Sequence, residues 1–239
     1  WNLRALVQRC LGDYAAATDA LSEAIGREPD NVDFLFNRSQ CYQETHDYQR
    51  AADDLDRAVA AGGDVPDPLL LYHRGLARYA LSRHGEDQTA CAQALVDLRE
   101  AIKQGLPAAQ QPDCHYQVGL ACANSERHEE AAEAFGLAAD LLPDMIPYHH
   151  ERAKSLQRIF RHAEALAEFN RVLMAQPKNA HAYFRRAFSL KALGRYEEAA
   201  GDLETAKAMS PDDPMLVVNY LQLHRTDAIE LCRAGQELY

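Results

Sequence analysis

A spacing of 34 residues recurs along this sequence and limits its fold more than any other feature. Pro143, Pro177 and Pro211 lie 34 residues apart. The stretch LGRYEEAA at residues 193–200 has a close counterpart in LGDYAAAT at residues 11–18 and a weaker one in THDYQRAA at residues 45–52. A repeat of about 20–50 residues indicates a chain built from stacked supersecondary units. The repeat therefore decides the fold class.

Aligning the chain at this period gives six copies whose columns agree. The eighth position is always small, the twenty-fourth is Leu or Phe, and the twenty-seventh is Ala or Val. The twentieth is alanine in every copy: Ala17, Ala51, Ala94, Ala131, Ala165 and Ala199. Positions 20, 24 and 27 share one helix face, because residues three and four apart are neighbours there. The pattern predicts an all-α chain of antiparallel helix pairs. Four of the pairs are ended by a proline that cannot continue the helix: Pro29, Pro143, Pro177 and Pro211.

The columns resemble the tetratricopeptide repeat family, in the small residue (Ala5, Ala187), the Gly-x-Tyr turn (Gly12–Tyr14, Gly194–Tyr196) and the closing proline. An aromatic residue near the start of a copy, as at Trp1 and Tyr183, also fits. The resemblance implies a right-handed α-α superhelix, or solenoid, with a concave groove. Six repeats are expected at 1–31, 32–66, 67–108, 112–145, 146–179 and 180–213. The third carries an insertion near 82–90, and 214–239 is expected to be a C-terminal capping helical segment.

Two columns vary together. Position 7 is arginine in five copies but Val118 in the fourth, and position 23 is acidic in four copies but Ala134 in that same fourth copy. We expect a partly buried salt bridge between the two helices of a repeat, absent as a pair from the fourth copy. The first copy, with Arg4 opposite Ala20, is an exception. These arginines are structural and are not counted as binding residues.

The resemblance also implies that the first helix of each repeat lines the groove. The groove residues that it implies are Phe36, Asn37, Tyr72, His73, Tyr116, Lys154, Arg158, His181, Phe184, Arg185, Phe188 and Lys191. Residues 146–210 contain 11 Lys or Arg against 7 Asp or Glu, in a chain of net charge −11. Bases and aromatics on one face favour an extended acidic peptide as ligand. The alternative is ordinary solvated surface, with Phe184 and Phe188 filling gaps between repeats.

Two functions remain open. One is a non-catalytic protein–protein interaction module whose groove binds an extended acidic peptide. The other is an architectural scaffold subunit of a large intracellular assembly, such as a ciliary or transport complex, docking through the convex face or the edges. Some members of the family hold acidic chaperone tails in a two-carboxylate clamp. Only Asn37 matches a clamp site, the other four being Asn2, Leu6, Leu69 and His73. We therefore expect no chaperone-tail clamp.

Composition and motifs argue against other classes. The acidic charge disfavours nucleic acid, and no apolar run is long enough for membrane insertion. His149, His150 and Glu151 are consecutive on a predicted helix and do not face one another, so we expect no enzyme, metal site or cofactor. The six cysteines lack any Cys-x-x-Cys pair, which favours free thiols in a reducing compartment. We expect an intracellular location, cytoplasmic or associated with the cytoskeleton.

Overall fold

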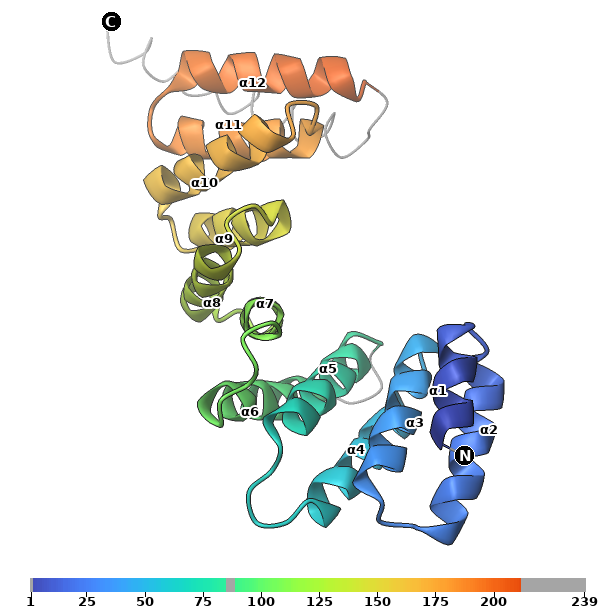
Figure 1. Cartoon of the computed structure of the whole chain (residues 1–239). Helices are drawn as coiled ribbons and strands as arrows, with labels where there is room; N and C mark the ends of the chain where they lie inside the picture. The colour runs from blue at the N-terminus through green and yellow to red at the C-terminus, as the bar shows by residue number, and fades with distance from the viewer. Residues whose placement is uncertain (1, 85–88, 212–239) are drawn as a thin grey trace, which may run out of the picture. The chain divides into compact units, whose positions relative to one another are not determined.

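The described part of the chain is all α-helix. The structure, a computed structural model, describes residues 2–84 and 89–211 of 239, and every regular element among them is an α-helix, which confirms the predicted fold class (Figure 1). The helices are α1 (Asn2–Cys10), α2 (Tyr14–Arg27), α3 (Val32–Glu44), α4 (Tyr48–Ala61), α5 (Pro68–His84), α6 (Ala90–Lys103), α7 (Gln111–Asn124), α8 (His128–Leu141), α9 (Ile146–Arg158), α10 (His162–Ala175), α11 (Ala180–Ala192) and α12 (Tyr196–Met209).

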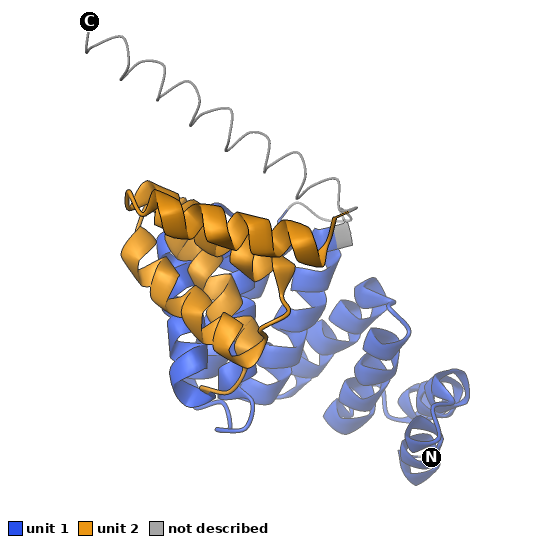
Figure 2. Cartoon of the chain, turned by 90° about the horizontal axis from the view of Figure 1, so that it is seen from above, with its two compact units in different colours: residues 1–142 blue, residues 143–239 orange. Residues whose placement is uncertain are grey.

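Two compact units divide the chain, residues 1–142 and 143–239, hereafter unit 1 and unit 2 (Figure 2). In unit 1 the pairs α1–α2, α3–α4, α5–α6 and α7–α8 pack together, and the second helix of each pair also packs on the first helix of the next. Unit 2 repeats this order with α9–α10 and α11–α12. Each unit is therefore a stack of helix pairs in which a pair contacts its neighbours along the chain.

The insertion near residues 82–90 falls at the end of a lengthened helix. α5 has 17 residues, whereas α3, α7, α9 and α11 have 13 or 14. Residues 85–88, Trp1 and the predicted capping segment 214–239 lie outside the described residues.

The alanine column forms the contact between the two helices of a pair. All six alanines are at most 3% exposed, and the Leu or Phe four residues later is equally buried. In two copies the facing position is glycine because the space is too small for a methyl group. A Cβ on Gly119 would lie 2.5 Å from the ring of Phe135, and one on Gly75 would lie 2.7 Å from Leu98. The columns seen in the sequence are thus packing contacts between helices.

The turn inside most pairs has one geometry. In the turn that ends α9, Phe160 N–H donates to Gln157 O at 3.2 Å and Arg161 N–H donates to Leu156 O at 2.9 Å. These two bonds make a Schellman motif, which places its next-to-last residue, here Phe160, in the left-handed region. The same pair of bonds closes the turns at Gly12, His46, Glu126 and Gly194. This shared turn is the reason for the repeated sequence between residues 11–18, 45–52 and 193–200.

The residue after the turn begins the second helix in one of two ways. Asp13 and Asp47 accept a hydrogen bond from the backbone N–H three residues later, at 3.0 and 3.2 Å. Such N-caps satisfy an amide that has no partner inside the helix. In the later copies arginine stands there and pairs with a glutamate three residues on, at 2.6–2.7 Å: Arg127–Glu130, Arg161–Glu164 and Arg195–Glu198. The acidic side chain then lies in the first turn of the helix, where the helix dipole favours it.

The predicted salt bridges inside the repeats are confirmed. Arg38 donates from Nε and Nη2 to the two carboxylate oxygens of Asp54, both at 2.7 Å, and Asp54 is 3% exposed. The same positions pair at 2.6 Å in Arg74–Asp97, 3.1 Å in Arg152–Glu168 and 2.7 Å in Arg186–Asp202. Val118 and Ala134 of the fourth copy are each 6% exposed and join one apolar cluster. The fourth copy has replaced the ion pair by apolar packing.

Candidate functional site

The residues that the sequence assigns to a groove all lie on the first helices of their pairs. In unit 1 they are Phe36 and Asn37 on α3, Tyr72 and His73 on α5, and Tyr116 on α7. In unit 2 they are Lys154 and Arg158 on α9, and His181, Phe184, Arg185, Phe188 and Lys191 on α11. The surroundings of the two sets differ, and this difference decides what each can bind.

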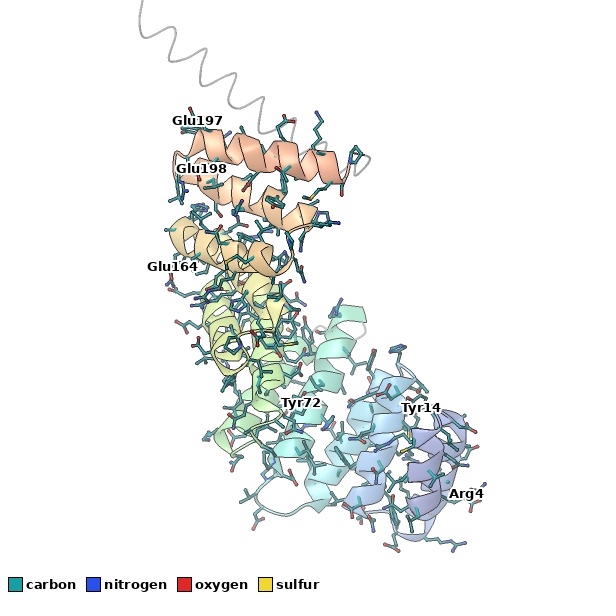
Figure 3. All side chains as sticks on the ribbon, turned by 45° about the horizontal axis from the view of Figure 1, so that its top comes forward. Arg4, Tyr14, Tyr72, Glu164, Glu197 and Glu198 are labelled. Carbon is teal, nitrogen blue, oxygen red and sulfur yellow. The ribbon has the colours of Figure 1, made fainter. Side chains whose placement is uncertain are left out.

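In unit 1 these side chains bind one another across neighbouring repeats. Asn37 Nδ2 donates to Asn2 Oδ1 at 3.1 Å, and the Tyr72 hydroxyl donates to Asp113 Oδ2 at 2.6 Å (Tyr72 is labelled in Figure 3). The rings of Phe36 and His73 meet edge to face with centroids 5.1 Å apart. These contacts run from α1 to α3, from α3 to α5 and from α5 to α7. They join one helix pair to the next.

The side chains of His73 and Tyr116 are largely packed against other residues of unit 1. Burial, with Arg9 as a second cause, lowers the pKa of His73 to about 4, so the ring is neutral at pH 7. Its Nδ1 is buried and has no hydrogen-bond partner among the described residues. The Tyr116 ring lies 5.5 Å from that of Phe135 and packs against the apolar cluster of α5–α8. Neither residue offers a positive charge to an acidic ligand.

In unit 2 the α9 lysine has a partner on its own helix. Lys154 Nζ donates to both carboxylate oxygens of Glu151, at 2.9 and 2.7 Å. Burial raises the pKa of Glu151, but hydrogen bonds from His150 and Lys154 outweigh burial and bring that pKa below its ordinary value. The charge of Lys154 is therefore largely neutralised by Glu151.

Arg158 and Arg185 are different. In the described ranges 2–84 and 89–211 neither guanidinium has a carboxylate within ion-pair distance. Burial, together with the charge of Arg158, lowers the pKa of Arg185, and the charge of Glu151 opposes this only in part. Two like charges near each other, one of them half-buried, destabilise each other until an anion binds between or beside them.

A hydrogen-bonded glutamine fixes the two helices that carry these arginines. Gln157 Nε2 donates to Arg185 O and to Ser189 Oγ, both at 2.7 Å, and the Gln157 side chain is nearly buried. α9 and α11 are thereby held side by side within unit 2. The contact includes the backbone carbonyl of Arg185, and Arg158 directly follows Gln157, so the backbone positions of the two arginines are held relative to each other.

The two phenylalanines of α11 have separate roles. Phe184 packs against the apolar cluster formed by Leu166, Ala187, Leu190, Ala199 and Leu203. Phe188 is 48% exposed and its ring lies 5.9 Å from that of His162. Gap filling, the alternative interpretation from the sequence, thus fits Phe184 and does not fit Phe188. We call the exposed or half-buried set Lys154, Arg158, His181, Arg185, Phe188 and Lys191 the first-helix surface of unit 2.

Sequence reasoning missed a buried polar cluster in the fifth copy. His149 is 3% exposed, and its two ring nitrogens lie 2.6 Å from Glu168 Oε2 and 2.8 Å from Pro143 O. Arg152 reaches the other oxygen of Glu168 with one bond at 3.1 Å and leaves its Nε unpartnered within the described chain. The signal was present in the sequence, because among the four copies that are acidic at position 23 only this one has glutamate instead of aspartate. His149 is thus part of the buried core of the repeat. The ring of His150 instead packs against that of Phe169, with centroids 6.1 Å apart.

No metal or membrane feature emerges from residues 2–84 and 89–211. They contain no group of three His, Cys, Asp or Glu side chains placed to hold a metal ion. Over the same ranges no helix has the length and apolar character needed to cross a membrane. Five cysteines in this part of the chain, Cys10, Cys41, Cys91, Cys114 and Cys122, are free thiols.

A protein-family profile matches two segments of the chain. The sequence profile described as Tetratricopeptide repeat matches residues 2–66 and 150–214, more than half of the chain. The two matched segments lie in different units and include α3 of unit 1 and α11 of unit 2.

Curated relatives are distant and much longer. Hsp70-Hsp90 organizing protein 3 of Arabidopsis thaliana is 22% identical over 202 residues, covering 83% of this chain and 34% of the relative. DnaJ homolog subfamily C member 3 of Gallus gallus is 26% identical over 218 residues, covering 85% and 41%. Serine/threonine-protein phosphatase 5 of Homo sapiens is 28% identical over 113 residues, covering 46% and 23%. The chain spans about a third of the length of the first of these relatives.

Solved structures agree on the fold. The structure of YrrB, described as a TPR protein with an unusual peptide-binding site, superposes with a TM-score of 0.73 at 19% identity, covering 87% of this chain and 99% of YrrB. The pilF protein of Pseudomonas aeruginosa gives a TM-score of 0.68 at 18% identity, covering 93% and 94%. At these identities the likeness establishes the tetratricopeptide fold and carries no ligand with it.

Proposed function

Because the chain belongs to the tetratricopeptide repeat family, we propose that it binds an extended acidic peptide on the first-helix surface of unit 2. Tetratricopeptide arrays are in general non-catalytic protein–protein interaction modules. The observation that supports an acidic ligand is the pair Arg158 and Arg185, two neighbouring guanidiniums with no carboxylate partner in the described part of the chain. The groove itself, with all twelve residues implied by the sequence, stays a proposal.

A carboxylate is the group that these arginines suit. Each guanidinium presents a planar set of donors that can bind a carboxylate with two parallel hydrogen bonds. Binding an anion removes the repulsion from Arg158 that, after burial, contributes to the lowered pKa of Arg185. Bonds to a half-buried charge are also stronger than bonds in open water. A single acidic side chain or a chain terminus would satisfy the site, and a run of acidic residues would reach Lys191 as well.

The chaperone-tail clamp does not fit these residues. The relatives named Hsp70-Hsp90 organizing proteins make this the natural alternative. At the clamp sites this chain has Leu6, Leu69 and the neutral His73, and its Asn37 is bonded to Asn2. We propose that the acidic segment is held in unit 2 by Arg158 and Arg185, and that no two-carboxylate clamp forms in unit 1.

The test is a peptide selection followed by charge reversal. A library of random dodecapeptides displayed on phage is selected on the full 239-residue chain, and selected peptides are titrated by fluorescence anisotropy. We expect enrichment of Asp and Glu, dissociation constants in the micromolar range, and weaker binding at high salt. Reversing Lys154, Arg158, Arg185 and Lys191 to Glu should weaken binding by about tenfold or more.

A matched control uses an open position elsewhere in unit 2. A Cβ atom on Gly201 of α12 would meet no neighbouring atom within 4 Å, so Gly201→Trp adds a large side chain at a position open to its first atom. This variant should bind the selected peptides as the wild-type chain does. The acidic-peptide proposal would be wrong if the selected peptides were not enriched in Asp and Glu. It would also be wrong if the variant with four reversed charges bound them with wild-type affinity.

The scaffold alternative has one observation in its favour. A hollow of about 460 Å³ lies between α10 and α12 beside α11, and it is lined in part by Asn170, Arg186, Glu198 and Gly201. An architectural subunit of a large assembly could dock there. In that case Gly201→Trp would abolish association with the partner while the charge-reversed variant kept it, the opposite of the result expected above.

We propose an intracellular site of action, in the cytoplasm or on the cytoskeleton. The free thiols of the described residues support it, because buried cysteines such as Cys41, Cys114 and Cys122 persist unpaired in reducing compartments. Neither a cofactor nor nucleic acid nor membrane insertion is part of the proposal.

A further inference from the structure

Phe160 occupies a backbone position that suits it poorly. It is the last residue of the turn between α9 and α10, with φ at +61°, and its side chain is 82% exposed. The left-handed region is unfavourable for bulky residues, because the Cβ atom crowds the following carbonyl. An exposed phenylalanine gains little by burial. Folding therefore offers no reason for this residue at this position.

The other turns of the chain show what the position favours. The equivalent residue is glycine in the turns at Gly12 and Gly194, where φ is +78° and +75°. In the remaining two it is a polar residue, His46 or Glu126. Phe160 is the one large apolar side chain among these five turns of the described chain. Strained positions that persist without a folding benefit are characteristic of functional sites.

Phe160 belongs to a group of exposed or half-buried rings in unit 2. Its ring lies 6.1 Å from that of His162, and the His162 ring lies 5.9 Å from that of Phe188, both edge to face. Phe188 is 48% exposed. His162 Nδ1 is buried and has no hydrogen-bond partner among the described residues. We call Phe160, His162 and Phe188 the aromatic cluster.

The aromatic cluster is continuous with the two arginines. Phe188 lies one helical turn beyond Arg185 on α11, and residues three apart on a helix share a face. Phe160 follows Arg158 by two residues at the end of α9. The apolar rings and the unpaired positive charges therefore form one continuous surface, which matches a ligand that carries both kinds of group.

We propose that the aromatic cluster binds a large apolar side chain of the same acidic peptide that Arg158 and Arg185 hold. This inference rests on the proposed function and adds the second half of the recognition motif, an aromatic or long aliphatic residue close to the acidic residues. Exposed rings that become buried against such a side chain give the packing typical of an interface hot spot. In this proposal the binding role of Phe160 outweighs the backbone strain that the residue causes in the turn.

The experiment compares two glycine substitutions at equivalent turns. Phe160→Gly removes both the backbone strain of a bulky residue at positive φ and the aromatic ring. Glu126→Gly removes the same kind of strain from the α7–α8 turn in unit 1 and leaves the aromatic cluster intact. Both variants should be folded and unfold at a urea concentration no lower than the wild-type chain. Phe160→Gly should bind the peptides selected on the wild-type chain about tenfold or more weakly. Glu126→Gly should bind them unchanged.

Selection on the variants separates this inference from the proposed function. Dodecapeptides selected on Phe160→Gly should remain rich in Asp and Glu but lose the enriched aromatic or aliphatic position. Dodecapeptides selected on the variant with four reversed charges should no longer be enriched in Asp and Glu. Equal affinity of Phe160→Gly and the wild-type chain would overturn the inference and leave the acidic site standing. If peptides selected on the wild-type chain were enriched in apolar residues but not in Asp or Glu, both the proposed function and this inference would be overturned. The ligand would then lack the charge that links the aromatic cluster to Arg158 and Arg185.

Discussion

Replacing Asp54 by alanine is expected to destabilise unit 1 by about 3–5 kcal/mol, as removal of one partner from a buried ion pair typically does. Asp54 is 3% exposed and accepts two hydrogen bonds from Arg38, whose side chain is only 15% exposed. Without Asp54 the guanidinium keeps only neutral partners, Ser22 Oγ at 3.0 Å and the ring of Tyr42, whose centroid is 5.7 Å away. Urea unfolding followed by circular dichroism measures the loss.

The fourth copy supplies the control. The double variant Arg38→Val with Asp54→Ala reproduces Val118 and Ala134, which are buried and well packed in their own repeat. We expect this double variant to lie within about 1 kcal/mol of the wild-type chain, because replacing a whole buried ion pair by apolar groups is often neutral. A double variant as unstable as Asp54→Ala alone would show that the covariation between positions 7 and 23 has another cause.

Acidification from pH 7 to pH 5 is expected to cost about 2 kcal/mol through His73 alone. Burial holds the pKa of His73 at about 4 in the folded chain, against an ordinary value of 6.5. Between these two values the unfolded chain binds a proton that the folded chain does not, so stability is present above pH 6.5 and is lost as the pH falls toward 4. Arg9 lowers the pKa further, and Asp113 opposes it in part.

Other groups titrate over the same range, so the comparison needs a variant. His73→Gln cannot take up the proton, and its stability should fall by about 2 kcal/mol less than that of the wild-type chain over the same pH interval. Urea unfolding of both proteins at pH 7 and pH 5 gives this difference. If the unfolding free energies of the wild-type chain and His73→Gln changed equally between pH 7 and pH 5, His73 would be hydrated and would protonate normally in the folded chain.

The helix pairs were predictable because their signals are contacts that recur. Ala131 and Phe135 stand in columns that five other copies repeat, and each column corresponds to one buried contact between the helices of a pair. The salt bridges were predictable for the same reason, since a buried arginine without its acid is costly and the two change together. Repetition within one chain supplied the evidence that a set of relatives usually supplies.

Individual environments were not predictable in this way. The sequence places Tyr72 and Arg185 in equivalent helices, but only the structure shows that Tyr72 is bonded to Asp113 while the charge of Arg158 acts on the half-buried Arg185. A repeat pattern fixes which face of a helix a residue occupies, whereas its partners come from neighbouring copies whose sequences differ. The positive φ of Phe160 was hidden because the turn signal, glycine, is absent there.

Photo-crosslinking tests most directly whether unit 2 holds the peptide. A selected dodecapeptide carries benzoylphenylalanine in place of its enriched apolar residue, is irradiated with the full chain, and the adducts are mapped by mass spectrometry after trypsin cleavage. We predict adducts on α9, on the turn at Phe160 and on α11, and their loss in the fourfold charge-reversed variant. Adducts confined to residues 2–142, or to the hollow between α10 and α12, would contradict the account.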